Sequence, residues 1–218
     1  TDSSRKSLTE KKYVFSGTAI FAPIEIEKYI RNYLQSLYML NSCTDDVTVD
    51  ETITGLKPYE QFTIKVKSGE LIVDTFECVH RVPTLGYGFS QIRKKLKTEF
   101  KELTGKEIGK LKQSGVQVTD DVVIPMLCYL GDTTEKVFEI NPSIFDYPTV
   151  IVECTYLEDK DDANADDRGH IVWHKLKPIV ESHPDTLFVL IHFSLKYSDD
   201  DIVRLFDPKP SNVELMLD

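Results

Sequence analysis

Residues 187–192, Leu-Phe-Val-Leu-Ile-His, form the strongest apolar run of the chain and end in a histidine. Residues 122–130 (VVIPMLCYL) and 149–154 (TVIVEC) are two further short apolar runs. Runs of this length are typical of strands buried inside a sheet. Residues 171–183 lie between two of these strands and place apolar side chains at helical spacing. Strands that alternate with helices predict a layered α/β domain.

The rest of the chain continues this pattern. Strands are expected at residues 13–22, 59–67, 70–80 and 85–90, with helices at 24–40, where Pro23 opens the helix, and at 199–206. Residues 91–112 are rich in lysine and are predicted to be helical in part, with a break near Thr104 and Gly105. Polar residues 42–52 and acidic residues 157–169 are expected to be loops. Residues 1–12 are expected to be flexible, and residues 207–218 to form a loose C-terminal tail.

The composition limits the class of protein. The chain has 218 residues, of which 41% are hydrophobic, so a substantial core is expected. No apolar run is long enough to span a membrane, and the polar start shows no secretion signal. Its net charge of −10 argues against broad binding of nucleic acid by the whole surface. The four cysteines form no Cys-x-x-Cys pair, which favours a reducing compartment, the cytosol or the nucleus.

Residues able to bind a metal stand at the ends of the expected strands. His80 and His192 each end an apolar run, and Asp132 follows a third in Gly-Asp-Thr-Thr. Neutral imidazole and carboxylate groups at converging strand ends are what a zinc site requires. The alternatives are ordinary: a histidine at a strand end is more often a plain surface or core residue, and Gly-Asp-Thr is usually a turn. His174 and His183 lack such a context and are expected at the surface.

Glu153 is unusual because it lies inside an apolar run. A buried carboxylate needs a partner. Glu153 either forms a structural salt bridge or orients a histidine of the site.

Five segments taken in order resemble ribonuclease Z, the tRNA 3′-processing endonuclease of the metallo-β-lactamase superfamily. They are residues 19–41 (AIFAPIEIEKYIRNYLQSLYMLN), 80–89 (HRVPTLGYGF), 129–134 (YLGDTT), 151–156 (IVECTY) and 190–197 (LIHFSLKY). The similarity extends over residues 13–206, which are expected to form a partial metallo-β-lactamase domain. The resemblance implies an α/β fold of the αββα sandwich type, represented mainly by its C-terminal half.

The resemblance also implies roles for individual residues. His80 would ligate one zinc ion, Asp132 would bridge two ions, and His192 would ligate the other. His170 would protonate the leaving oxygen and Glu153 would orient His170. Two further residues, Lys196 and Thr134, would contact the substrate. The complete site would hold two zinc ions and hydrolyse RNA, with a tRNA precursor as the expected substrate.

Departures from the family pattern leave alternatives open. The family's His-x-His-x-Asp-His motif should lie before residue 19, yet no histidine precedes His80. Three ligands spread over two ions are too few for tight binding. Val152, Cys154 and Lys196 replace the family's histidine, alanine and arginine, and lysine lacks the planar fork that arginine offers a phosphate. The alternatives are a non-catalytic interaction protein of the same fold and a hydrolase of small phosphodiesters.

Two expectations concern partners. The lysines between Arg93 and Lys112 could steer a nucleic-acid backbone, although interleaved Glu99, Glu102 and Glu107 favour a solvated helix face. Half of a sandwich exposes its inner apolar face. We therefore expect the chain either to be covered by a missing N-terminal half or to form a homodimer.

Overall fold

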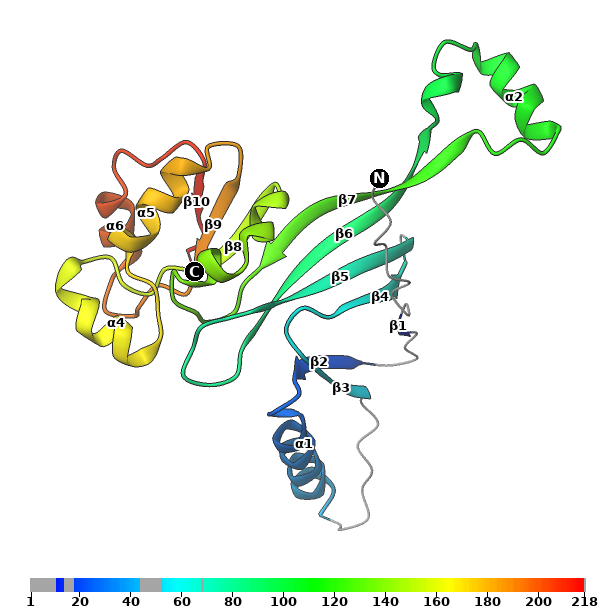
Figure 1. The fold of residues 1–218 in the computed structure, drawn as a ribbon. Helices are drawn as coiled ribbons and strands as arrows, with labels where there is room; N and C mark the ends of the chain where they lie inside the picture. Colours follow the sequence, from blue (N-terminus) through cyan, green and yellow to red (C-terminus); the bar gives the residue numbers. More distant parts are fainter. Residues whose placement is uncertain (1–10, 14–17, 44–51, 68, 218) are drawn as a thin grey trace.

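The computed structural model describes residues 11–13, 18–43, 52–67 and 69–217 (Figure 1). The strands are β1 Lys11–Tyr13, β2 Ala19–Pro23, β3 Thr52–Leu56, β4 Gln61–Val66, β5 Gly69–Glu77, β6 Leu85–Leu96, β7 Thr119–Tyr129, β8 Thr149–Glu153, β9 Leu187–Ile191 and β10 Val213–Leu215. The α-helices are α1 Glu27–Ser42, α2 Gly105–Gln113, α3 Val137–Ile140, α4 Asp162–Arg168, α5 Trp173–Ser182 and α6 Asp199–Leu205. Short 3₁₀ helices cover Thr98–Phe100, Pro142–Asp146 and Asp159–Asp161. No helix among these residues is long and apolar enough to cross a membrane.

Eight strands form one mixed sheet in the order β1-β4-β5-β6-β7-β8-β9-β10. The strands β4 to β7 pair antiparallel, whereas β7, β8, β9 and β10 pair parallel. A separate two-stranded parallel sheet joins β2 to β3. Because β5 and β7 run in the same direction as β8 and β9, the carboxyl ends of all four strands lie at one edge of the large sheet.

The alternation of side chains along β4 and β5 gives the sheet two packed faces. On one face Phe62 and Val73 pair across the strands, and Phe21 of β2 stacks on Phe62 with ring centroids 4.8 Å apart. On the other face Phe76 packs edge-on against Tyr147. The small sheet therefore covers one face and helical segments cover the other, which is the layering of an αββα sandwich with a much reduced second sheet among the described residues.

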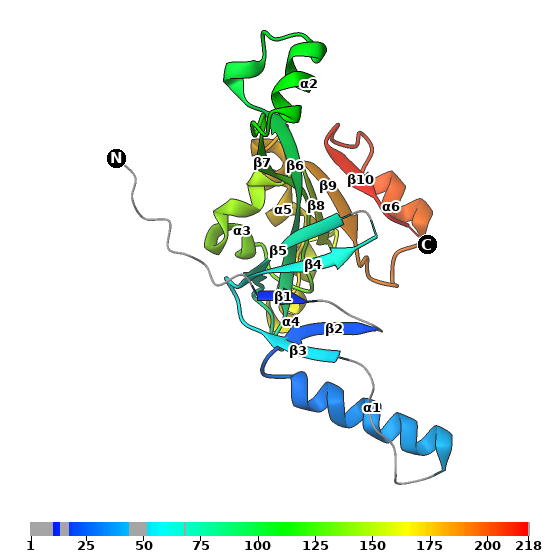
Figure 2. The same ribbon diagram turned by 90° about the vertical axis from the view of Figure 1, so that its right-hand side faces the viewer.

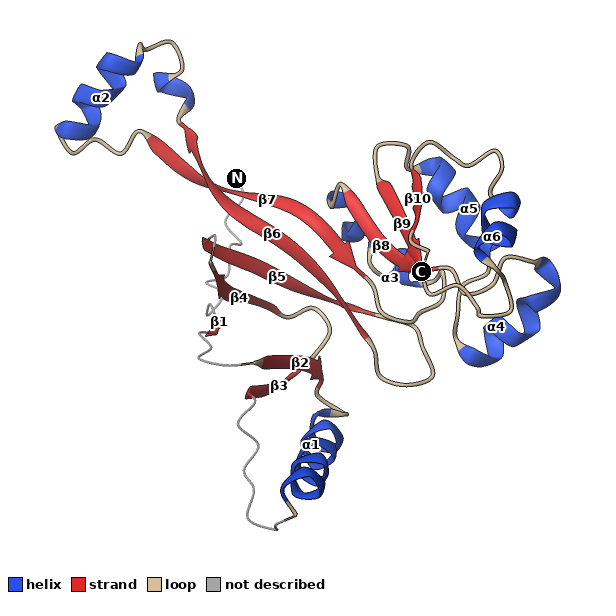
Figure 3. Cartoon of the chain, turned by 180° about the vertical axis from the view of Figure 1, so that it is seen from behind, coloured by secondary structure: helices blue, strands red, loops and turns tan. Residues whose placement is uncertain are grey.

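The main core surrounds β8 and β9. Val150, Val152, Phe188 and Leu190 are fully buried against α3, α5 and α6. Figure 3 shows these helices gathered at this end of the sheet. The alternate side chains on the opposite face, among them Ile151 and Val189, are only half-buried. One face of the strands is thus sealed by helices and the other is partly open.

The longest strands, β6 and β7, run beyond the sheet and carry α2 at their tip (Figures 1 and 3). The arm confirms that residues 91–112 are helical in part and corrects the remaining details of that prediction. Residues 91–96 continue β6 because they pair residue by residue with β7. Thr104 and Gly105 begin a helix rather than break one, since Thr104 and Glu107 form a capping box.

Three further predictions differ from the structure. Pro23 ends β2, and the following helix begins at Glu27. The acidic segment 157–169, expected to be a loop, contains α4, whose Ala165 is fully buried. The expected loose tail at 207–218 contains β10, which pairs with β9 and buries Val213 in the core. Of the flexible segment predicted at residues 1–12, residues 1–10 lie outside the described residues, whereas Lys11 and Lys12 belong to β1. Residues 44–51 of the loop expected at 42–52 also lie outside them.

Candidate metal centre

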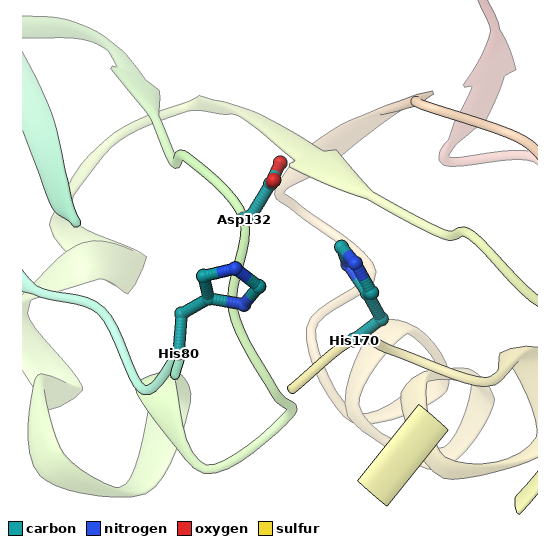
Figure 4. A group of neighbouring side chains, drawn as sticks. All are labelled: His80, Asp132 and His170. Atoms are coloured by element: carbon teal, nitrogen blue, oxygen red, sulfur yellow. The ribbon is translucent and has the colours of Figure 1, made fainter. Parts of the chain in front are cut away.

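Four side chains with metal-binding atoms meet at the carboxyl edge of the sheet. His80 follows β5, Asp132 follows β7 and His192 directly follows β9, while His170 lies between α4 and α5. Figure 4 shows His80, Asp132 and His170 close together. Strands that point the same way bring their ends together, so residues that are remote in sequence become neighbours.

The distances define a compact cluster. The ring centroid of His170 lies 5.1 Å from that of His80 and 5.4 Å from that of His192. The ligand atoms of His80, Asp132 and His170 all lie within 4.8 Å of one another. His192 Nε2 is 3.9 Å from an Asp132 carboxylate oxygen. The four residues singled out in the sequence therefore converge.

The backbone of Gly169 fixes the ring of His80. Its carbonyl oxygen lies 2.9 Å from His80 Nδ1. Gly169 has a φ of +76°, and an added Cβ would lie 2.9 Å from the same Nδ1. Glycine is needed here both for the left-handed backbone and for the close approach. Because a carbonyl only accepts, Nδ1 of His80 carries the proton and Nε2 is free to bind a metal.

Glu153 occupies the centre of the polar network and is 1% exposed. Its carboxylate accepts hydrogen bonds from the backbone N–H groups of Thr133 (2.8 Å) and Ile171 (3.2 Å) and from the Thr155 hydroxyl (2.6 Å). It also lies 2.7 Å from His170 Nδ1. This hydrogen bond raises the pKa of His170 against the opposing effect of burial. The partner expected for Glu153 is therefore a histidine of the cluster.

His192 adopts an unusual backbone, with a φ of +61°. Left-handed backbone costs a residue with a Cβ about 1–2 kcal/mol and persists where surrounding structure holds it. Thr155 Oγ1 lies 2.8 Å from His192 Nδ1, leaving Nε2 toward Asp132. Thr155 was not identified from the sequence, although a hydroxyl two residues after an expected buried carboxylate is a signal that could have found it.

The two expected substrate contacts lie in different surroundings. The Lys196 ammonium forms an ion pair with Asp161 at 2.5 Å and lies over the Tyr156 and Tyr197 rings. The Thr134 hydroxyl is buried without a hydrogen-bond partner among the described residues. Thr134 and His80 line an open cavity of about 580 Å³ whose walls also carry basic and acidic side chains. These charged residues are Arg81, Glu135, Lys136, Asp166, Asp167 and Lys175.

The remaining two histidines do not join the cluster. His174 lies 3.1 Å from Asp159 and 3.4 Å from Asp162 and is partly exposed. His183 is half-buried and stacks on Phe145 with ring centroids 3.5 Å apart.

The donor set suits a metal such as zinc. Each of the three imidazole rings uses Nδ1 in a hydrogen bond, and one carboxylate lies beside them. Catalytic zinc sites use the same kinds of ligand. Two ligand atoms on one tetrahedral zinc ion lie about 3.4 Å apart. His192 Nε2 and the Asp132 carboxylate oxygen are 3.9 Å apart, so a small movement would bring them to that spacing. The residues present fit a metal ion.

Known proteins are similar to the chain in both sequence and fold. No protein-family model matches the chain. The chain is 29% identical over 209 residues to tRNase Z TRZ1 of Arabidopsis thaliana, which covers 94% of this chain and 72% of that protein. It is 27% identical to the chloroplastic tRNase Z TRZ2 of the same plant, covering 87% of this chain and 52% of that protein. It is 30% identical to the nuclear ribonuclease Z of Triticum aestivum over 52% of this chain and 61% of that protein.

Among solved structures, the metallo-β-lactamase fold protein YhfI of Bacillus subtilis matches with a TM-score of 0.50. The match covers 91% of this chain and 75% of that protein at 11% identity, so it supports the fold alone. The expected resemblance and fold class are confirmed. The chain is therefore similar in sequence to tRNase Z proteins and has the metallo-β-lactamase fold.

Proposed function

We propose that the chain is a metal-dependent phosphodiester hydrolase acting on RNA, as the names of its tRNase Z relatives suggest. The observation that carries the proposal is the convergence of His80, Asp132, His170 and His192 at one sheet edge. Hydrolysis of a phosphodiester needs an activated water, neutralised phosphate charge and a proton for the leaving oxygen. The cluster contains groups that could serve each of these three requirements.

His80 would hold one metal ion and His192 a second through their Nε2 atoms, and the Asp132 carboxylate would serve both. The metal supplies activation of water and stabilisation of negative charge on the phosphate. His170 would hold the proton destined for the leaving oxygen. Glu153 keeps the His170 ring in place and raises its pKa, which increases the protonated fraction near neutral pH.

We propose zinc as the metal because imidazole nitrogen and carboxylate oxygen are its usual ligands. Among the described residues, His80, Asp132 and His192 offer three donors for the two ions. A two-ion site, as in the family, would require additional ligands from another polypeptide segment.

We propose a tRNA precursor as the substrate. Lys94 and Lys97 of the arm pair with Asp121 and Asp120, so their charges are partly neutralised. Other lysines of the arm are exposed and form no ion pair among the described residues, and they could attract the phosphate backbone. They are Lys95, Lys101, Lys106, Lys110 and Lys112. Thr134 would contact substrate from the cavity beside His80, and Lys196 would do so after exchanging its partner Asp161.

A second copy of the chain, or a missing N-terminal half, is proposed to cover the open face of β7, β8 and β9. Tyr129, Ile151 and Val189 are paired across these strands and form an apolar row opposite the helices. Tyr129 is 42% exposed. Burying such a row is favourable at roughly 25 cal/mol per Å². Sedimentation at rising concentration should reveal a dimer, and a monodisperse folded monomer would contradict the proposal.

We propose the cytosol or nucleus as the compartment. All four cysteines are free, and three are buried. Free buried thiols are typical of reducing compartments.

The proposed activity is tested by incubating the purified chain with zinc and a tRNA precursor carrying a 3′ extension. We expect cleavage that EDTA abolishes and that His192→Ala reduces by at least about 100-fold, as expected when a metal ligand is lost. His174→Ala, which alters a histidine outside the cluster, is the matched control and should retain activity.

Two outcomes favour the alternatives. Faster turnover of a simple aryl phosphodiester than of the tRNA precursor would indicate a hydrolase of small phosphodiesters. Absence of both zinc binding and cleavage would indicate a non-catalytic protein that kept the fold.

A further inference from the structure

Thr155 lies between Glu153 and His192 and contacts both side chains. Its hydroxyl oxygen lies 2.6 Å from Glu153 Oε2 and 2.8 Å from His192 Nδ1. The residue is 7% exposed, so water offers little competition for these contacts. Backbone hydrogen bonds from Cys154 N–H to the Ile191 oxygen and from Ser194 N–H to the Thr155 oxygen hold the two segments together.

The direction of the two hydrogen bonds follows from the neighbours of Glu153. Two backbone N–H groups, of Thr133 and Ile171, point at its carboxylate, and both can only donate. A carboxylate surrounded by these donors acts as their acceptor. The single proton of the Thr155 hydroxyl is therefore donated to Glu153. The hydroxyl can then only accept from His192, so His192 Nδ1 carries the proton.

We infer that Thr155 is a positioning residue that holds His192 in the tautomer protonated on Nδ1, with the lone pair of Nε2 facing Asp132. The inference rests on the proposed function for its consequence, because Nε2 is the atom offered to the metal. Hydrogen bonds of this kind fix the tautomer and orientation of a metal-binding histidine.

Comparison with the rings of His80 and His170 shows what Thr155 does for His192. His80 is fixed by a backbone carbonyl and His170 by a carboxylate, and both groups only accept. A hydroxyl is different because it can donate or accept. Thr155 selects the tautomer of His192 only because Glu153 takes its proton. The carboxylate thereby orients His170 directly and His192 through Thr155.

The test measures the tautomer of His192 by nitrogen-15 NMR of the metal-free chain at a pH where its imidazole is neutral. In the wild-type chain and in Thr155→Ser, which keeps the hydroxyl, we expect the proton on Nδ1. In Thr155→Val, which keeps the shape but loses the hydroxyl, we expect a shift toward the form protonated on Nε2. Zinc affinity, measured by competition with a chromogenic chelator, should fall about 10- to 100-fold in the valine variant and be restored by serine.

A wild-type His192 protonated on Nε2 would overturn the inference, and this measurement does not depend on whether any variant folds. Retention of the Nδ1 form in a folded Thr155→Val chain would overturn it as well. If the wild-type chain binds no zinc, the proposed function fails, whereas the tautomer measurement still decides the role of Thr155.

Discussion

The β8–β9 end of the sheet and the arm that carries α2 are stabilised differently. Around β8 and β9, strands and helices share a core in which Phe188, Leu190 and Val150 are fully buried. Neither α2 nor α1 has a buried residue, although all of their residues are described. Figure 2 places these two helices at opposite ends of the molecule. The candidate metal centre lies in the packed region, so its geometry depends on the core, to which α1 and α2 add no buried side chain.

The largest expected difference comes from removing the same side chain in each region. Leu190→Ala deletes a fully buried leucine and should lower the free energy of unfolding by about 2–5 kcal/mol. Leu40→Ala in α1, where the leucine is 74% exposed, should change it by less than about 0.5 kcal/mol. Urea denaturation of both variants measures the contrast. Similar losses in the two variants would mean that α1 is packed against something else in solution.

The second prediction compares two glycines with left-handed backbone. Gly169→Ala and Gly115→Ala share the backbone cost of about 1–2 kcal/mol. Only at Gly169 does the new Cβ crowd His80, whereas nothing lies within 4 Å at Gly115. Overpacking adds about 1–3 kcal/mol at Gly169. Zinc affinity should also fall for Gly169→Ala alone. Equal behaviour of the two variants would remove Gly169 from the support of His80.

The third prediction uses a motif that occurs in both regions. Thr104 caps α2 and Ser198 caps α6, each in a capping box. Loss of such a cap costs about 1 kcal/mol. Ser198→Ala should lower global stability because Ile202 of α6 is part of the core. Thr104→Ala should instead increase amide hydrogen exchange within residues 105–113 while global unfolding remains unchanged. A global loss from Thr104→Ala would show that the arm unfolds together with the core.

The smallest expected effect is a dependence of stability on pH in the packed region. Glu153 raises the pKa of His170 above its ordinary value of 6.5. A raised folded pKa means that the stabilisation is fully present below about pH 6.5 and is lost as pH rises through the folded pKa. Glu153→Gln should abolish this decline and lower the His170 pKa. Thermal unfolding across pH 5–9 and NMR titration of His170 measure both effects. An unchanged His170 titration in the variant would contradict the assigned cause.

The sequence predicted the part of the molecule in which pattern and chemistry coincide. The apolar runs that became β5, β7, β8 and β9 located the central strands, and His80, Asp132, Glu153 and His192 lie at or just after the ends of these strands. The unusual carboxylate in an apolar run correctly indicated a partner for Glu153, which is His170.

Features that depend on tertiary contacts could not be predicted in this way. The strand β10 is only three residues long and exists because it pairs with β9. The acidic α4 has a weak apolar pattern and is held by the buried Ala165. Residues 91–96 contain lysines that suit an exposed helix, yet pairing with β7 makes them strand. The role of Gly169 became visible only with His80 beside it.

The central claim is that the edge of the sheet formed by β5, β7 and β9 gathers a metal site. Anomalous diffraction at the zinc edge from crystals grown with zinc tests it most directly. We expect anomalous density about 2.0–2.2 Å from Nε2 of His80 or of His192 and from the carboxylate of Asp132. No peak in that position, or zinc bound instead at His174 between Asp159 and Asp162, would contradict the claim.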